Sequence, residues 1–189
     1  MRIISNAELQ QLAMVISKND ISVSQVLELI KKRNKVIDVT SIDIELIVDY
    51  SKSVEQAISE GNYDIKESDI NANNFPVDPE LIGKTVKVKS RLFNFDEPLI
   101  SQRVIREMDQ VDYRPANLME ILAFGAARPE LQRVITIIAF GSRWEDHDGY
   151  YCLPALHVCN NKRYLNTALF AEMFTSSLFA LGIPKESPK

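Results

Sequence analysis

The stretch VITIIAF, residues 134–140, followed by YYCLPALHV, residues 150–158, decides how we interpret the fold. The first stretch is apolar and largely β-branched at both alternating positions, which is typical of a central strand buried on both faces. The second stretch predicts a partner strand, and Asp148-Gly149 between the two is a turn signal. Pro154 interrupts the second strand, so we expect it at a sheet edge or at a bulge. The sequence therefore predicts a hairpin within a short antiparallel sheet.

Other elements surround this hairpin in the C-terminal half. Residues 84–93 alternate between apolar and basic side chains, which predicts a half-exposed strand. We expect flanking helices at 99–108 and 118–127, the second capped by Asn117 with Glu120, and a last apolar helix at 167–181. Residues 81–189 are thus predicted to form an α+β domain.

The N-terminal part has a helical pattern instead. Apolar residues recur at helical spacing over about 6–18, 23–34 and 41–60, and a capping-box sequence precedes each stretch. We therefore predict an α+β protein in which residues 1–61 form a three-helix bundle that precedes the sheet-containing domain. Residues 62–80, rich in asparagine and proline, are interpreted as a linker or irregular wrap.

Bulk composition excludes some classes of function. The chain has 189 residues and a formal net charge of −4, which argues against nucleic-acid binding over the whole surface. Its start has no apolar signal-peptide region, and its longest strongly apolar run, 134–140, is too short to span a bilayer. Two cysteines form no disulfide framework. We therefore expect a cytoplasmic protein with reduced thiols and no membrane partner.

All histidines and cysteines of the chain fall in one short region. They are His147, Cys152, His157 and Cys159. Zinc prefers such ligands in tetrahedral arrangement, so a zinc-dependent or zinc-stabilised hairpin is one hypothesis. The region lacks the paired C-x-x-C spacing of strong zinc motifs. The alternative is a polar hairpin tip with two small packed thiols and no cofactor.

Two sets of basic residues suggest a nucleic-acid interface. One set lies on the strand predicted at 84–93 and comprises Lys84, Lys87, Lys89 and Arg91. The other ends the second predicted helix and comprises Lys31, Lys32 and Arg33. The first two helices have helix-turn-helix proportions. The alternatives are a lysine-protected edge strand and basic residues that complement a helix dipole.

The sequence shows no convincing catalytic constellation. It contains no G-x-S-x-G nucleophile elbow and no complete glycine-rich phosphate loop. We therefore expect a non-enzymatic protein that binds another macromolecule, most simply another protein. If the last apolar helix were partly exposed, it would also offer a homodimer surface.

Residues 113–165 resemble an uncharacterised family of small bacterial and phage-associated proteins. The resemblance rests on the segments YRPANLMEILAFG (113–125), PELQR (129–133), IIAFGSRW (137–144), DG (148–149), LPAL (153–156) and RYL (163–165). The family has no known activity, so the resemblance implies no catalytic residues. It implies a compact helix-plus-hairpin domain and favours an inhibitor or adaptor carried by a phage or another mobile element.

Overall fold

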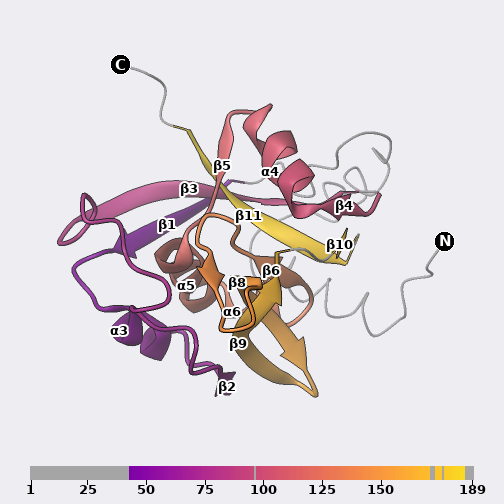
Figure 1. Ribbon diagram of the computed structural model, residues 1–189. Coiled ribbons are helices and arrows are strands. Elements are labelled where there is room, and N and C mark those ends of the chain that lie inside the picture. The colour runs from indigo at the N-terminus through magenta and orange to yellow at the C-terminus, as the bar shows by residue number, and fades with distance from the viewer. Residues whose placement is uncertain (1–42, 96, 171–172, 176, 186–189) are drawn as a thin grey trace.

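The computed structural model describes residues 43–95, 97–170, 173–175 and 177–185 (Figure 1). The strands of its large sheet are β1 (Ile44–Asp49), β2 (Ile65–Lys66), β3 (Thr85–Phe93), β5 (Tyr113–Pro115), β6 (Thr136–Ile138), β7 (Trp144–Glu145), β8 (Tyr151–Cys159), β9 (Lys162–Leu169) and β11 (Leu178–Pro184). A separate two-stranded ribbon consists of β4 (Leu99–Ile100) and β10 (Met173–Phe174). The helices are α3 (Val54–Glu60), α4 (Ser101–Asp109), α5 (Leu118–Ala127) and α6 (Pro129–Gln132).

The large sheet is mixed and nine-stranded. Its main path runs β1-β3-β11-β6-β8-β9-β2, with β5 added to β11 and β7 added to β8. The β11–β6 and β2–β9 pairs are parallel and the others are antiparallel. Strands β8 and β9 form a long hairpin closed by Asn160 and Asn161, both with left-handed φ values of 49° and 60°. Asparagine tolerates this left-handed backbone, which a two-residue turn between paired strands requires.

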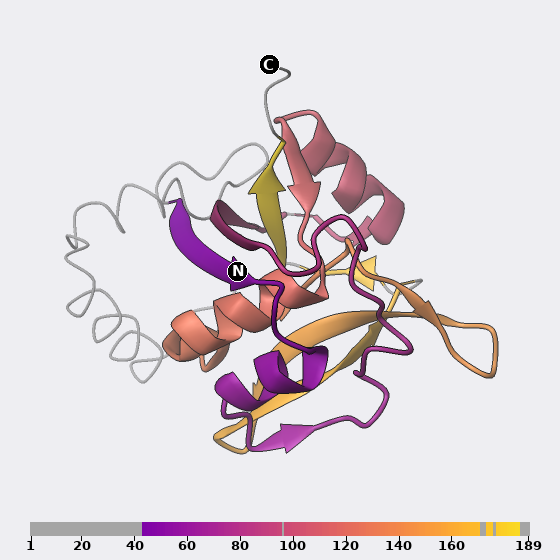
Figure 2. The ribbon, with the colours of Figure 1, turned by 90° about the vertical axis from the view of Figure 1, so that its left-hand side faces the viewer.

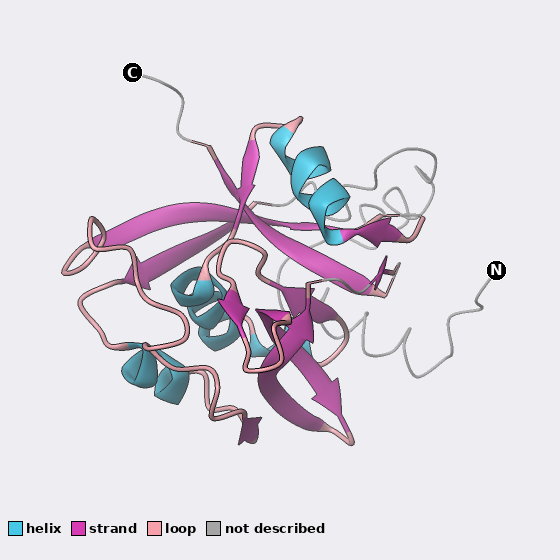
Figure 3. Ribbon diagram, in the orientation of Figure 1, coloured by secondary structure: helices cyan, strands magenta, loops and turns pink. Residues whose placement is uncertain are grey.

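The central strands of the sheet are buried on both faces, and α4 lies on one side of the sheet while α3 and α5 lie on the other (Figure 3). Neighbouring residues of one strand point to opposite faces, and on β8 Leu156 joins the core beneath α3 and α5 while Leu153 and Ala155 join a second core beneath α4. Strand β6 divides in the same way, with Ile137 in the first core and Ile138 in the second. This double burial explains why the central strands are apolar at both alternating positions.

The predicted fold class is wrong, because most of the described structure is one large mixed sheet and no N-terminal three-helix bundle is shown. The helices predicted at 6–18 and 23–34 lie outside the described residues. The helix predicted at 41–60 is replaced by strand β1 and the short helix α3. Residues 44–49 alternate between buried and exposed side chains, a strand period, and the functioning capping box is Ser53 with Gln56.

The helix predicted at 167–181 is also wrong. The described parts of this range include the end of β9, the strand β10 and the start of β11. Strand β11 lies inside the sheet between β3 and β6, and both of its faces are covered, since Leu181 belongs to one core and Ala180 to the other. An apolar run buried on both faces has no helical period of its own, and its composition alone did not separate a helix from an interior strand.

Pro154 lies inside the sheet rather than at its edge. Its carbonyl accepts a hydrogen bond from Ala139 N–H at 3.0 Å, so the imino nitrogen of Pro154 faces the same side. Strand β6 ends at Ile138. At this point any residue other than proline at position 154 would have a backbone N–H that needs a hydrogen-bond acceptor. The proline therefore removes no ladder hydrogen bond between β8 and β9.

Several local predictions are confirmed. The strand predicted at 84–93 is β3, and the helix predicted at 99–108 is α4. Helix α5 occupies 118–127 with Asn117 as its N-cap and Glu120 completing a capping box. No helix among the described residues is long and apolar enough to cross a membrane.

A buried arginine joins three helices to the sheet. The side chain of Arg163 on β9 donates to the carbonyl of Gly61 at 2.6 Å, the carbonyl of Gly125 at 2.7 Å and Oε1 of Gln132 at 3.0 Å. Its guanidinium also lies 5.0 Å from the ring centre of Tyr63. Arg163 is only 4% exposed. Because Gly61 caps α3 and Gly125 lies in the last turn of α5, the positive charge sits at the negative ends of two helix dipoles.

We expect Arg163→Ala to lower the free energy of unfolding by about 3 kcal/mol, because it leaves three buried acceptors without their donor. Urea denaturation followed by circular dichroism measures this change. Arg133→Ala is the matched control, since Arg133 donates to the carbonyl of Asn161 at the surface, and it should cost less than about 0.5 kcal/mol. Equal losses in the two variants would contradict the role given to Arg163.

Candidate functional site

The four predicted metal ligands are spread over the β7–β8–β9 region. His147 lies in the β7–β8 connection with its side chain 88% exposed and its Nε2 3.5 Å from the Asp148 carboxylate. Cys152 is buried near the start of β8, whereas Cys159 is exposed at the end of that strand. Seven residues of extended strand separate the two thiols by roughly 23 Å.

His157 has partners other than a metal set. Its Nδ1 lies 2.9 Å from Oδ1 of Asn166, and its ring stacks on Tyr164 with centroids 4.8 Å apart. Throughout the described part of the chain, no three His, Cys, Asp or Glu side chains come together as a metal-binding group. The structure therefore does not support the zinc hypothesis. Burial and the nearby Asp146 carboxylate raise the pKa of the Cys152 thiol.

The predicted basic strand face is shared with carboxylates from β1. Lys87 pairs with Glu45 at 2.8 Å, and the Arg91 guanidinium donates to the Asp43 carboxylate at 2.9 Å. Lys89 lies opposite Glu45 in the β1–β3 register. The surface therefore alternates in sign instead of forming a continuous positive stripe. Lys84 directly precedes β3, and the second basic set, Lys31, Lys32 and Arg33, lies outside the described residues.

The segment 113–125 builds a buried polar network at the start of α5. Glu120 is fully buried, and its carboxylate accepts two hydrogen bonds from the Arg114 guanidinium, at 2.6 and 2.9 Å. It also accepts the backbone N–H of Asn117 at 2.8 Å. The Asn117 amide donates to the Tyr50 hydroxyl at 3.1 Å, which ties α5 to the residue after β1. Burial and the Glu120 charge raise the pKa of Tyr50 to about 12, so this hydroxyl stays protonated.

Residues 141–142 complete this network. Gly141 is held against the backbone, since an added Cβ would lie 2.6 Å from the Ala116 carbonyl oxygen. Ser142 then offers its hydroxyl to the N–H of Leu118, the first residue of α5, at 2.8 Å. These partners accept hydrogen bonds from backbone N–H groups at the start of α5, which have no acceptor within the helix. The segments that carry the family resemblance thus position α5.

A groove runs along the edge of the sheet at β1. Among the described residues, β1 pairs only with β3. The N–H of Tyr50 donates to the Lys84 carbonyl at 2.8 Å, so by antiparallel alternation the main-chain groups of Glu45, Ile47 and Asp49 point away from β3. Ile47 is 69% exposed. Sequence analysis missed this strand, although its alternation of buried and exposed residues was the available signal.

Helix α5 supplies the apolar wall of the groove, which encloses about 410 Å³. Ala123, Ala126 and Ala127 lie on one face of the helix, and their small side chains leave space between α5 and β1. The lining also includes Met119, Leu122 and Ala57, together with Leu46 and Ile47 of β1. Figure 2 shows α5 lying beside β1, with α3 below them.

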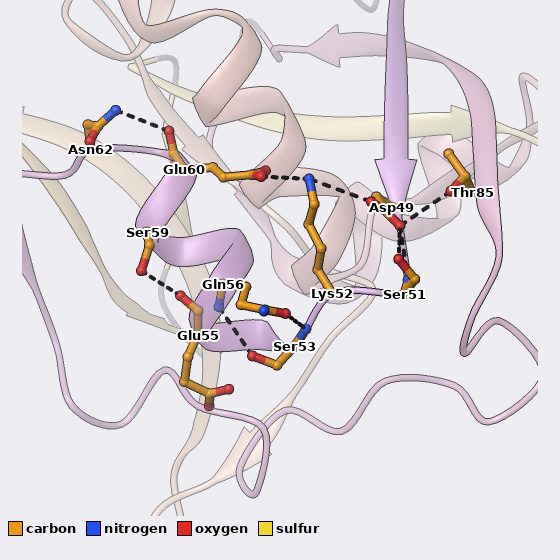
Figure 4. A network of polar contacts seen from close by, with 10 residues as sticks. All are labelled: Asp49, Ser51, Lys52, Ser53, Glu55, Gln56, Ser59, Glu60, Asn62 and Thr85. Carbon is orange, nitrogen blue, oxygen red and sulfur yellow. Dashed lines mark hydrogen bonds and ion pairs between the residues drawn. The ribbon is translucent and has the colours of Figure 1, made fainter.

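Charged residues surround one end of the groove (Figure 4). Nζ of Lys52 lies 2.6 Å from the Glu60 carboxylate and 3.5 Å from the Asp49 carboxylate. Asp49 also accepts hydrogen bonds from Ser51 and Thr85, and these neighbours lower its pKa. With Glu45, the lining holds three carboxylates against one ammonium group. Chemically, the groove offers a strand edge, an apolar hollow and an acidic rim.

The two thiols should react at different rates. We expect iodoacetamide at pH 8 to alkylate exposed Cys159 at least about tenfold faster than Cys152, because a raised pKa leaves less reactive thiolate. Peptide mass spectrometry over time separates the two sites, and Cys159→Ser isolates the slow one. Similar rates at both sites would contradict the buried position of Cys152.

No protein-family model, curated protein or solved structure matches this chain.

Proposed function

We propose that this protein is a non-enzymatic protein-binding module that accepts an extended segment of its partner along the β1 edge. The main support for this proposal is that β1 has main-chain groups that point away from β3, and that its exposed Ile47 lies beside an apolar groove. A partner strand would pair with the main chain of Glu45, Ile47 and Asp49. Strand addition of this kind derives affinity from the backbone and specificity from side-chain pockets.

The groove supports a particular kind of partner segment. The space over Ala123 and Ala126 accommodates an apolar side chain that alternates with the backbone contacts. Because Glu45 is already paired with Lys87, Asp49 and Glu60 leave one carboxylate in excess of Lys52, which favours a lysine or arginine in the same segment. An adaptor or inhibitor carried by a phage or another mobile element would use such a surface, and this biological setting rests on the family resemblance alone.

The test compares three forms of the full chain. In a nuclease-treated pull-down from the native host lysate, the unaltered protein and Ile82→Lys should retain the same near-stoichiometric partner. Ile47→Lys should lose at least about tenfold in affinity, because a lysine at an edge strand opposes strand addition. Ile82 is the matched control, since it is 62% exposed and lies outside the groove lining.

A second variant addresses the hollow itself. Ala126→Leu fills space between α5 and β1 without weakening the helix, and it should reduce binding of the same partner. Binding that is equal in all these forms would contradict the β1 site. A retained component that disappears on nuclease treatment would instead favour nucleic acid, and recovery of the chain's own second copy would favour a homodimer.

A further inference from the structure

A second hollow lies on the opposite face of the sheet, beneath the ribbon strand β10. Its floor is formed by β6, β8 and β9, where Ile138, Ala155 and Asn166 lie side by side in the register. Met173 and Phe174 of β10 line it as well. The cavity exists because Ala155 and Ala168 place small side chains where the neighbouring positions of this core carry large ones.

The cavity is small and mainly apolar. Its volume is about 100 Å³. A dry void lined by apolar groups costs stability, because its lining loses dispersion contacts on the empty side. An engineered apolar cavity of roughly 150 Å³ accepts benzene, which has six non-hydrogen atoms, so by this scale the interior here holds about four such atoms, and a six-atom ligand places the rest in the mouth.

Polar groups are confined to a few positions in the lining. The Ser101 hydroxyl already donates to the carbonyl of Phe170. Asn166 directs its Nδ2 at the Thr167 carbonyl, at 3.2 Å, so its Oδ1 faces His157. His157 then donates from Nδ1, and in the tautomer that carries its proton there Nε2 is the acceptor.

Two of these groups remain available to a ligand. Within the described residues, neither Nε2 of His157 nor the hydroxyl of Thr136 has a hydrogen-bond partner. His157 is also fixed in place, since its ring is held by Asn166 and stacked on Tyr164. His157 lines the cavity and its Nε2 is open to solvent, so the cavity combines a preformed acceptor at its surface with an apolar interior.

We propose that this cavity binds a small, mainly apolar alcohol whose hydroxyl donates to Nε2 of His157. The aliphatic part occupies the space over Ala155 and Ala168, and the Thr136 hydroxyl lies in the same lining to donate to the alcohol oxygen. This site lies on the face opposite the β1 groove and does not depend on the proposed protein-binding function.

Methyl-detected NMR of the full chain tests this site with 1-pentanol as the probe. The methyl signals of Ala155 and Ala168 should shift in a saturable way. 1-Methoxybutane has the same number of non-hydrogen atoms but no donor, and it should bind about fivefold more weakly because one hydrogen bond is lost. His157→Phe preserves an aromatic ring on Tyr164 and should abolish this preference for the alcohol.

A variant that fills the cavity with a larger side chain provides a second test of the proposed site. Ala168→Leu should remove the saturable shifts, whereas Ala72→Leu, in an exposed turn outside both hollows, should leave them unchanged. If Ala168→Leu fails to fold, the comparison of 1-pentanol with 1-methoxybutane on the unaltered chain still tests the proposal. The proposal is overturned by an absence of saturable shifts, by equal binding of alcohol and ether, or by undiminished binding in folded Ala168→Leu.

Discussion

The guanidinium of Arg163 is the constraint on which one whole face of the molecule depends. It has no carboxylate hydrogen-bond partner for its side chain within the described structure, and its charge is balanced by carbonyl dipoles at the ends of α3 and α5. Gln132 extends this contact, because its Nε2 donates to the carbonyls of His157 and Tyr164 while its Oε1 accepts from Arg163. One buried charge therefore fixes α3, α5 and α6 on the β8–β9 hairpin. An exposed ion pair, by contrast, typically contributes little to stability.

The groove at β1 follows from two such networks at opposite ends of α5. Arg163 holds the C-terminal end of the helix, whereas Glu120 and Asn117 hold its N-terminal end against Tyr50, one residue after β1. The apolar wall and the strand edge are thus held relative to each other before any partner arrives. Such a preformed site spends less binding free energy on ordering its own side chains.

The sequence predicted local elements better than their assembly. Strand β3 and helices α4 and α5 were identified because caps and alternation are encoded within a few positions. The residues of β1 and β11 were assigned to helices, since their partners are distant in sequence and isoleucine or leucine occurs in both kinds of element. Both hollows depend on side chains from several such segments. Of their residues, only His157 was singled out beforehand, and for a different reason.

Among the described residues the two edges of the large sheet differ, and this difference supports the proposed interaction surface. At one edge β2 has only two residues, which is too short to direct the pairing of another chain. At the other edge β1 has six residues and contains no proline or lysine. Proteins usually interrupt or charge such an edge to prevent unwanted pairing. On β1 the two charged residues, Glu45 and Asp49, lie toward the ends, while the exposed Ile47 occupies the middle of the strand, and the adjoining helix face carries alanines that leave room for an incoming side chain. An edge of that length beside a shaped apolar groove is better explained by strand pairing than by solvent exposure alone.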